Sequence, residues 1–180
     1  MNMRRLLVVL VVLIAALPVL AQTDVGFKGI GGRLAFVDPE GDYDGTIGFG
    51  VVADLGEWIP QLHWDASAMY WSSSAGYVNG DFKIHDVGLR SSVKYHFIKG
   101  PWEPYAGGGI GIHMYGWSYE WHHGYYGAPD NTNTQFGLQI LGGVEHQFNP
   151  NWKGSAEVEF DFQDFGQTLL QVNAIYMLGK

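Results

Sequence analysis

The stretch KGSAEVEFDFQDF, residues 153–165, alternates between two kinds of side chain. Every second residue from Lys153 to Gln163 is polar or charged, whereas the residues between them, from Gly154 to Phe162, are small or apolar. A period of two predicts a β-strand, because successive side chains of a strand point to opposite faces. The segment therefore has one charged face and one apolar face, and the fold depends on which of them lies inside.

The same alternation recurs along most of the chain. After residue 21 there is no helical periodicity of useful length and no apolar run long enough for a membrane-spanning helix. Each alternating segment has about ten or more residues, which suits a tilted membrane-spanning strand. The sequence therefore predicts an all-β chain of eight strands, at about residues 25–37, 45–55, 61–72, 82–97, 104–119, 135–148, 152–164 and 167–178.

The N-terminal segment, residues 1–21, has the three parts of a secretory signal peptide. Two arginines precede a short apolar core at residues 6–17, and Ala21 is a small residue of the kind found at cleavage sites. We expect cleavage before Gln22 and a single barrel domain over residues 22–180. The alternative is an uncleaved membrane anchor, for which the apolar core is short.

The charge of the chain excludes some classes of partner. Without the two arginines of the signal peptide, eight of the ten basic residues remain against 18 acidic ones, a net charge of −10. A nucleic-acid partner would require a basic patch, so none is expected. The chain contains no cysteine, so disulfides do not stabilise it. Stability must come from the sheet and its surroundings.

The connections between the predicted strands alternate in length. Those at residues 38–45, 72–81 and 119–134 are long, whereas those between them, such as 99–103 and 149–151, are short. If the chain begins in the periplasm, the long loops lie at the outer end of the barrel and the short turns at its inner, periplasmic end, which is the arrangement of outer-membrane barrels.

Aromatic residues distinguish a membrane barrel from a soluble, lipocalin-like barrel with the same alternation. They gather in two belts about one strand apart, as membrane interfaces select, because indole and phenol rings are partly apolar and partly polar. The belt near the short turns comprises Trp58, Trp102, Trp152, Tyr95, Phe97 and Tyr176. The belt near the long loops comprises Tyr70, Trp71, Trp117, Tyr119 and Trp121. We therefore predict that the apolar face contacts lipid and the polar face lines the lumen.

An eight-stranded barrel has an interior just wide enough for side chains to fill it. Buried charges must pair or meet water, so we expect an ionic plug centred on Arg33 and Arg90 with Glu157 and Glu159. The alternative is a proton or ion path through the same residues. The whole predicted network comprises Arg33, Arg90, Lys94, Asp65, Asp86, Glu145, Lys153, Glu157, Glu159 and Asp161.

The signal peptide, the eight strands, the loop lengths, the aromatic belts and the glycine-rich segment PYAGGGIGIHMYGW (104–117) together resemble the small outer-membrane β-barrel family, of the OmpA, OmpX and OmpW type. The resemblance implies an up-and-down antiparallel transmembrane barrel in the bacterial outer membrane. It also implies a monomer that contacts the bilayer and lipopolysaccharide and is inserted by the outer-membrane assembly machinery.

The expected function is a structural and surface-interaction role, in which the outer loops contact lipopolysaccharide or other partners. One alternative is an OmpW-like channel for small apolar molecules, for which Val52 and Met69 on the polar face are a weak indication. A second alternative is the soluble periplasmic binder, which requires the two faces to be exchanged.

No catalytic motif is expected. Lipid A deacylases of this family use a His-x-Ser pair with a glutamate near the outer rim, but Met114 and Tyr115 follow His113, and no serine stands two residues after His122 or His123. A nucleophile needs a base within hydrogen-bond reach, so we predict that the chain is not an enzyme.

No cofactor or metal is expected either. The adjacent His122 and His123 make a poor chelate without a third ligand, because zinc sites use three or four. Four acidic residues crowd one loop, but their spacing is not that of an EF-hand. The expectation is a solvated acidic loop, with divalent bridging to lipopolysaccharide as the alternative; its residues are Asp38, Glu40, Asp42 and Asp44.

Overall fold

A computed structural model describes residues 24–41, 43–77, 80–121, 131–164 and 166–178. The predicted signal peptide lies outside these residues. The described chain forms eight strands and contains no helix long and apolar enough to cross a membrane. The strands are β1 (Asp24–Pro39), β2 (Thr46–Ile59), β3 (Leu62–Tyr77), β4 (Gly80–His96), β5 (Trp102–Trp121), β6 (Asn131–Asn149), β7 (Trp152–Phe162) and β8 (Gln167–Met177).

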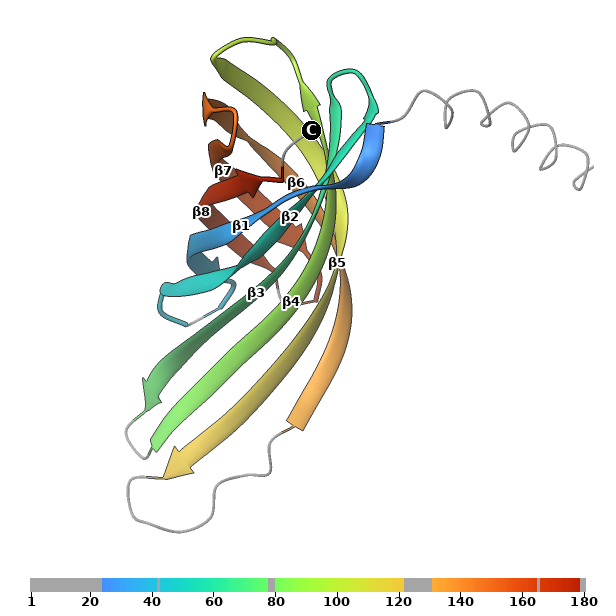
Figure 1. Cartoon of the computed structure of the whole chain (residues 1–180). Helices are drawn as coiled ribbons and strands as arrows, with labels where there is room; N and C mark the ends of the chain where they lie inside the picture. Colours follow the sequence, from blue (N-terminus) through green and yellow to red (C-terminus); the bar gives the residue numbers. More distant parts are fainter. Residues whose placement is uncertain (1–23, 42, 78–79, 122–130, 165, 179–180) are drawn as a thin grey trace, which may run out of the picture.

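The strands close into one antiparallel barrel in chain order, and β1 pairs with both β2 and β8. Each strand therefore pairs with its neighbours in sequence, which is the up-and-down topology (Figure 1). Closure leaves no open sheet edge in the barrel wall, so the backbone groups are satisfied within the sheet. The predicted fold class, an eight-stranded up-and-down barrel, is confirmed.

The two ends of the barrel differ. The turn end carries the short turns at residues 60–61, 97–101 and 150–151, together with the ends of β1 and β8. The loop end carries the other four connections. At the loop end β3, β4, β5 and β6 project well beyond the rest of the barrel, toward the bottom of Figure 1. In barrels of this kind the short turns face the periplasm.

The projecting strands are longer than the alternation predicts. β3 was expected to end near residue 72 but continues to Tyr77, because Ser73 pairs with Ile84 and Gly76 with Asp81 across β4. Outside the bilayer a strand needs no apolar outer face, so the ladder continues where the sequence pattern has already faded.

The opening stretch has its charged face inside the barrel. Glu157 and Glu159 on β7 are 2% and 1% exposed, whereas Val158 and Phe160 are 38% and 43% exposed on the outer surface. The same division holds along the other strands, where large apolar side chains face outward and charged ones inward. The soluble, lipocalin-like alternative is wrong, because it requires the apolar face inside.

Glycines on β5 allow its backbone to approach β4 closely. A Cβ atom on Gly107 would lie 2.2 Å from the carbonyl oxygen of Val93, and one on Gly109 would lie 2.2 Å from that of Ser91. Real Cβ atoms do not come so close to backbone oxygen, so side chains are excluded at these positions. The glycine-rich character of the predicted fifth strand is therefore a packing requirement of the inner wall.

The two predicted aromatic belts differ in how many of their residues lie on the outer surface. At the turn end, Trp58, Trp102, Trp152, Tyr95, Phe97 and Tyr176 are all exposed on the outer surface. At the loop end, Tyr70 is exposed, whereas the side chains of Tyr119 and Trp121 lie outside the described residues. The assignment of Trp117 to the lipid-facing belt is wrong, because it pairs with the buried Ile84 and therefore shares the inner face.

The assignment of Trp71 to a belt is wrong. Its side chain is fully buried inside the barrel, where its ring lies 6.4 Å from that of Tyr115. Tyr70 and Trp71 are consecutive residues of one strand, so they point to opposite faces. Because Tyr70 faces outward, Trp71 must face the lumen.

Candidate functional site: the barrel interior

The middle of the lumen contains ion pairs between opposite walls. Arg90 on β4 lies 3.1 Å from Glu159, measured from Nε to Oε1, and its Nη2 donates a 2.9 Å hydrogen bond to Asp161 Oδ2. Both acids are on β7, which does not pair with β4 in the sheet. All three side chains are at least nine-tenths buried. The contacts therefore cross the lumen rather than follow its wall.

Glu157 is the centre of a second group of contacts. Lys94 Nζ lies 2.8 Å from Glu157 and 2.5 Å from Asp65, and Tyr105 donates a 2.8 Å hydrogen bond to Glu157. Arg33 Nη2 is 3.9 Å from the same carboxylate. These residues come from β1, β3, β4, β5 and β7, so one carboxylate connects five strands.

Amide side chains link the two groups. Gln171 on β8 donates hydrogen bonds to both Glu157 and Glu159, the second at 2.8 Å. Arg33 donates a 2.8 Å hydrogen bond to Asn173. Carboxylates held by several donors need less bulk water, so these amides connect the two groups into one network.

Nearer the turn end, Lys153 lies between two carboxylates. Its Nζ is 2.7 Å from Asp54 and 3.0 Å from Glu145. Asp54 was not in the predicted network, although its phase in the alternation of β2 already placed it on the polar face. Among the predicted acids Glu145 is the most accessible, with its side chain 15% exposed.

Nearer the loop end, Asp86 pairs with a histidine instead of a lysine or arginine. His113 Nδ1 lies 2.8 Å from Asp86 Oδ2, and both side chains are fully buried. The other ring nitrogen, Nε2, faces Asp161 at 3.8 Å. A catalytic His–Asp pair would present that nitrogen to a nucleophile; here it is directed at a carboxylate.

The structure thus places all ten predicted network residues inside the barrel and brings them into three ion-paired groups and one His–Asp pair. Asp54, His113 and Tyr105 were not among the residues predicted for the network. Tyr105 lies on the same face of β5 as Gly107, Gly109 and His113, so the phase of β5 would have indicated its inward position.

An apolar layer lies in the part of the lumen nearer the loop end, beside the Asp86–His113 pair. Here side chains from five strands pack together, and Tyr43 packs against them from the connection between β1 and β2. The sequence indicated Met69 as an apolar lumen residue but not the extent of the layer. This apolar layer comprises Ala35, Val37, Met69, Trp71, Ile84, Tyr115 and Leu169.

A small cavity lies inside the lumen toward the turn end. This cavity, near Asp54, His63 and Lys153, has a volume of about 10 Å³, which is room for no more than one water molecule. Val52, the other predicted apolar lumen residue, is buried beside it.

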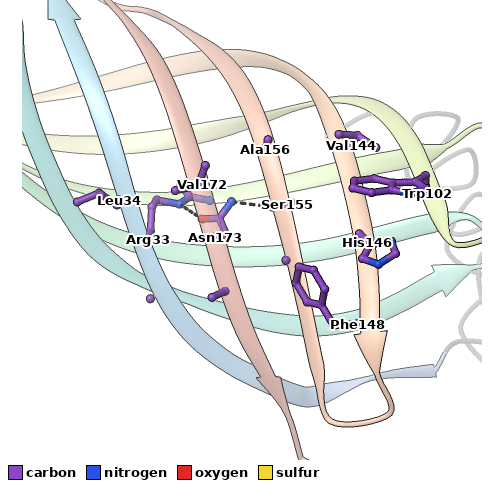
Figure 2. A pocket seen from close by; sticks show the side chains of 13 residues that line it. Arg33, Leu34, Trp102, Val144, His146, Phe148, Ser155, Ala156, Val172 and Asn173 are labelled. Carbon is purple, nitrogen blue, oxygen red and sulfur yellow. Dashed lines mark hydrogen bonds between the residues drawn. The ribbon is translucent and has the colours of Figure 1, made fainter.

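A larger hollow, of about 640 Å³, lies on the outer wall (Figure 2). Small residues of β1, β7 and β8, such as Gly32, Gly154 and Ala174, form part of its lining. Behind them Arg33 donates to Asn173, and Asn173 donates a 2.9 Å hydrogen bond to Ser155. The hollow opens toward the lipid side, so it provides no path through the lumen. Its larger outward-facing side chains are Leu34, Trp102, Val144, His146, Phe148 and Val172.

Comparisons with known proteins agree with this architecture. Residues 7–177 match the family model of the outer membrane protein beta-barrel domain. Curated proteins provide no match to the chain.

Three solved structures resemble the chain in fold. Neisserial surface protein A (NspA) is 18% identical, with a TM-score of 0.56 over 83% of this chain and 95% of that one. The outer membrane protein OprG from Pseudomonas aeruginosa is 14% identical, with a TM-score of 0.59 over 87% and 95%. Ail, the attachment invasion locus protein of Yersinia pestis, solved with the heparin analogue sucrose octasulfate, is 15% identical, with a TM-score of 0.52 over 84% and 97%. The chain belongs to the outer membrane protein β-barrel domain family and is an eight-stranded barrel of the bacterial outer membrane.

Proposed function

We propose that this protein is a closed, non-conducting barrel that supports an interaction surface at its loop end. The observation that carries the proposal is the set of ion pairs across the lumen, from Arg90 to Glu159 and Asp161 and from Lys94 to Glu157. An ion crossing the lumen would have to separate buried charges from their partners, which costs several kcal/mol per pair. It would then have to pass the apolar layer.

The direct test is conductance. We expect the refolded barrel to give no steady openings in a planar bilayer, because paired charges and the apolar layer occupy the lumen and the cavity beside Asp54 and Lys153 has a volume of only about 10 Å³. Heat-shifted gel mobility of the same sample shows that the protein is folded, and an open porin recorded in the same bilayer shows that openings would be detected. Steady small openings would instead indicate a water path past Arg90 and would contradict the closed barrel.

A second candidate function is an OmpW-like conduit for small apolar molecules. The apolar layer favours it, because Trp71 and Leu169 would offer an apolar solute a compatible surface. Against it, these two side chains are fully buried by their neighbours, so a conduit requires them to move. Uptake of an apolar solute into vesicles that contain the barrel, without ion conductance, would favour this function.

For the interaction surface we propose lipopolysaccharide bridged by divalent cations as the first partner. The end of β1 and the loop that follows it expose Asp38, Glu40 and Asp44 at the loop end, whereas Asp42 lies outside the described residues. The related Ail barrel was solved with a sulfated polyanion, but acidic side chains repel an anionic lipid unless a cation lies between them. The outer loop at residues 119–134, with its aromatic residues, is the second proposed contact.

We expect the variant Asp38→Asn/Glu40→Gln/Asp44→Asn to bind lipopolysaccharide about tenfold more weakly than the parent in millimolar Ca²⁺, because carboxylate charge sets calcium affinity. Binding is measured by flotation of the folded barrel with labelled lipopolysaccharide, with and without chelator. Asp24→Asn, at the turn end, is the control and should bind like the parent. Equal binding with and without chelator would contradict cation bridging.

We also propose that the chain has no enzymatic role and is monomeric after insertion by the assembly machinery. The His113–Asp86 pair, the nearest approach to a catalytic arrangement in the described lumen, is directed at Asp161 and closed off from solvent.

A further inference from the structure

Two histidines and a glutamate meet at the turn-end mouth of the lumen, outside the ionic network. They are His63 on β3, His96 on β4 and Glu103 on β5, and one ligand atom of each lies within 4.8 Å of those of the other two. His96 Nδ1 is 3.0 Å from Glu103 Oε2. The His63 and His96 rings are stacked, with centroids 4.1 Å apart. Three adjacent strands thus bring three potential metal ligands together.

One of the two imidazoles has a nitrogen atom that no described protein group contacts. His96 is fully buried, yet its Nε2 atom makes no hydrogen bond within the described part of the chain. His63 Nε2 also makes no hydrogen bond there, although Glu57 lies close to it. Buried polar atoms without a partner are uncommon in native proteins and are often satisfied by a water molecule or an ion. The Tyr105 ring stacks on His96 at 5.1 Å and holds it in place, so the imidazole cannot simply turn away to solvent.

The surrounding charges favour a cation. Glu57 Oε1 lies 3.2 Å from His63 Nε2, which adds a second carboxylate to the cluster. Lys94 and Lys153 line the same part of the lumen, but each is already paired with two carboxylates. Lys99, which contacts Glu57 at 3.4 Å, is half exposed and can move into solvent.

We propose that His63, His96 and Glu103 bind a divalent transition-metal ion such as Zn²⁺ at the periplasmic mouth of the barrel. Imidazole nitrogen selects zinc, copper and nickel over calcium and magnesium, and a His₂Glu set leaves a fourth position for water or for Glu57. Ligand atoms about 2.0–2.1 Å from a tetrahedral ion lie about 3.3 Å apart. His96 Nδ1 and Glu103 Oε2, which are 3.0 Å apart, already have nearly this spacing, and a rotation of His63 would complete the site.

The ion has a route into the site. The side chains of His63 and Glu103 are 19% and 24% exposed, so the cluster opens to the solvent at the turn end. A bound ion would join β3, β4 and β5 where the short turn at residues 97–101 connects the last two. The site thus requires no passage through the lumen.

The proposal is tested by zinc titration of the refolded, tag-free chain in which His122→Gln and His123→Gln remove the adjacent histidine pair. We expect one Zn²⁺ per barrel by calorimetry, and binding at least about tenfold weaker after His96→Gln or Glu103→Gln. The control is His146→Gln, which changes a histidine on the outer surface and should leave binding unchanged.

Cobalt gives a second readout that needs no variant of the site. Co²⁺ bound by two imidazoles and a carboxylate should give the visible absorption of a four-coordinate ion, and Zn²⁺ should abolish that absorption at one equivalent. The proposal is overturned if the barrel binds no Zn²⁺, or if the affinity is the same in folded His96→Gln and Glu103→Gln barrels. Loss of Zn²⁺ binding on replacement of His122 and His123 would also overturn the proposal, because the ion would then be bound by that pair and not by His63, His96 and Glu103.

Discussion

Replacing Arg90 by alanine is expected to lower the free energy of unfolding of the barrel by about 3–5 kcal/mol, the range observed when one partner of a buried ion pair is removed. Arg90 is the only cation among the described residues within 4 Å of Glu159, and the only lysine or arginine within that distance of Asp161. Both carboxylates are at least nine-tenths buried, so they cannot recover their lost interaction from bulk water. The large loss of stability comes from these two buried carboxylates, which are left without a cationic partner.

The measurement is equilibrium unfolding in urea from lipid vesicles, monitored by tryptophan fluorescence and by heat-shifted gel mobility. Lys99→Ala is the matched control, because it also removes a cation from an ion pair but at a half-exposed site, where about 1 kcal/mol or less is expected. Adding Glu159→Gln and Asp161→Asn to Arg90→Ala should restore part of the lost free energy of unfolding, because the unpaired carboxylates are then neutral. If Arg90→Ala unfolds at the same midpoint as the parent, the lumen is hydrated and the ionic plug does not exist.

The second large effect is expected on the outer wall. Leu170→Arg should cost about 2–4 kcal/mol, the penalty for arginine on the lipid face of a barrel near the bilayer midplane. Leu170 on β8 is 59% exposed and pairs with Val158 on β7, six residues from Trp152 at the turn end. In a water-soluble barrel the same exposed position would accept arginine with almost no change in stability.

Two variants separate a lipid effect from a packing effect. Leu170→Ala removes the same side chain without adding a charge, and it should cost less than Leu170→Arg. Ser74→Arg adds the same charge to an exposed position of β3 near the loop end, where a change within about 0.5 kcal/mol is expected. Equal costs for Leu170→Arg and Ser74→Arg would mean that both positions meet water.

Much of the fold could be predicted because the decisive signals are local. Alternation along residues 153–162 depends only on the two-residue period of a strand. The tryptophans at residues 58, 102 and 152 lie beside short turns that can be seen in the sequence itself. The same local rule applied more strictly would have moved Trp71 from the lipid face to the lumen, because Tyr70 is its neighbour in the strand.

The site was less predictable, because its contacts join strands that are far apart in the sequence. Alternation places Lys94 and Glu157 on the polar face, but their 2.8 Å contact depends on how the closed sheet staggers its strands. The apolar layer is a similar case, since Val37, Met69 and Leu169 belong to inner faces that also carry charged or amide side chains. These short apolar stretches become a layer only when closure brings them to one level.

The sequence by itself determined that this protein is a membrane barrel, which way its strands face and which residues line its lumen, because these depend on the period of a strand and on the cost of placing charge in lipid. Only the tertiary structure decided which charged side chains pair, that an apolar layer forms toward the loop end, and that His63, His96 and Glu103 converge at the other end. Those features depend on strand tilt and register around a closed sheet, which long-range pairing sets and no local pattern records.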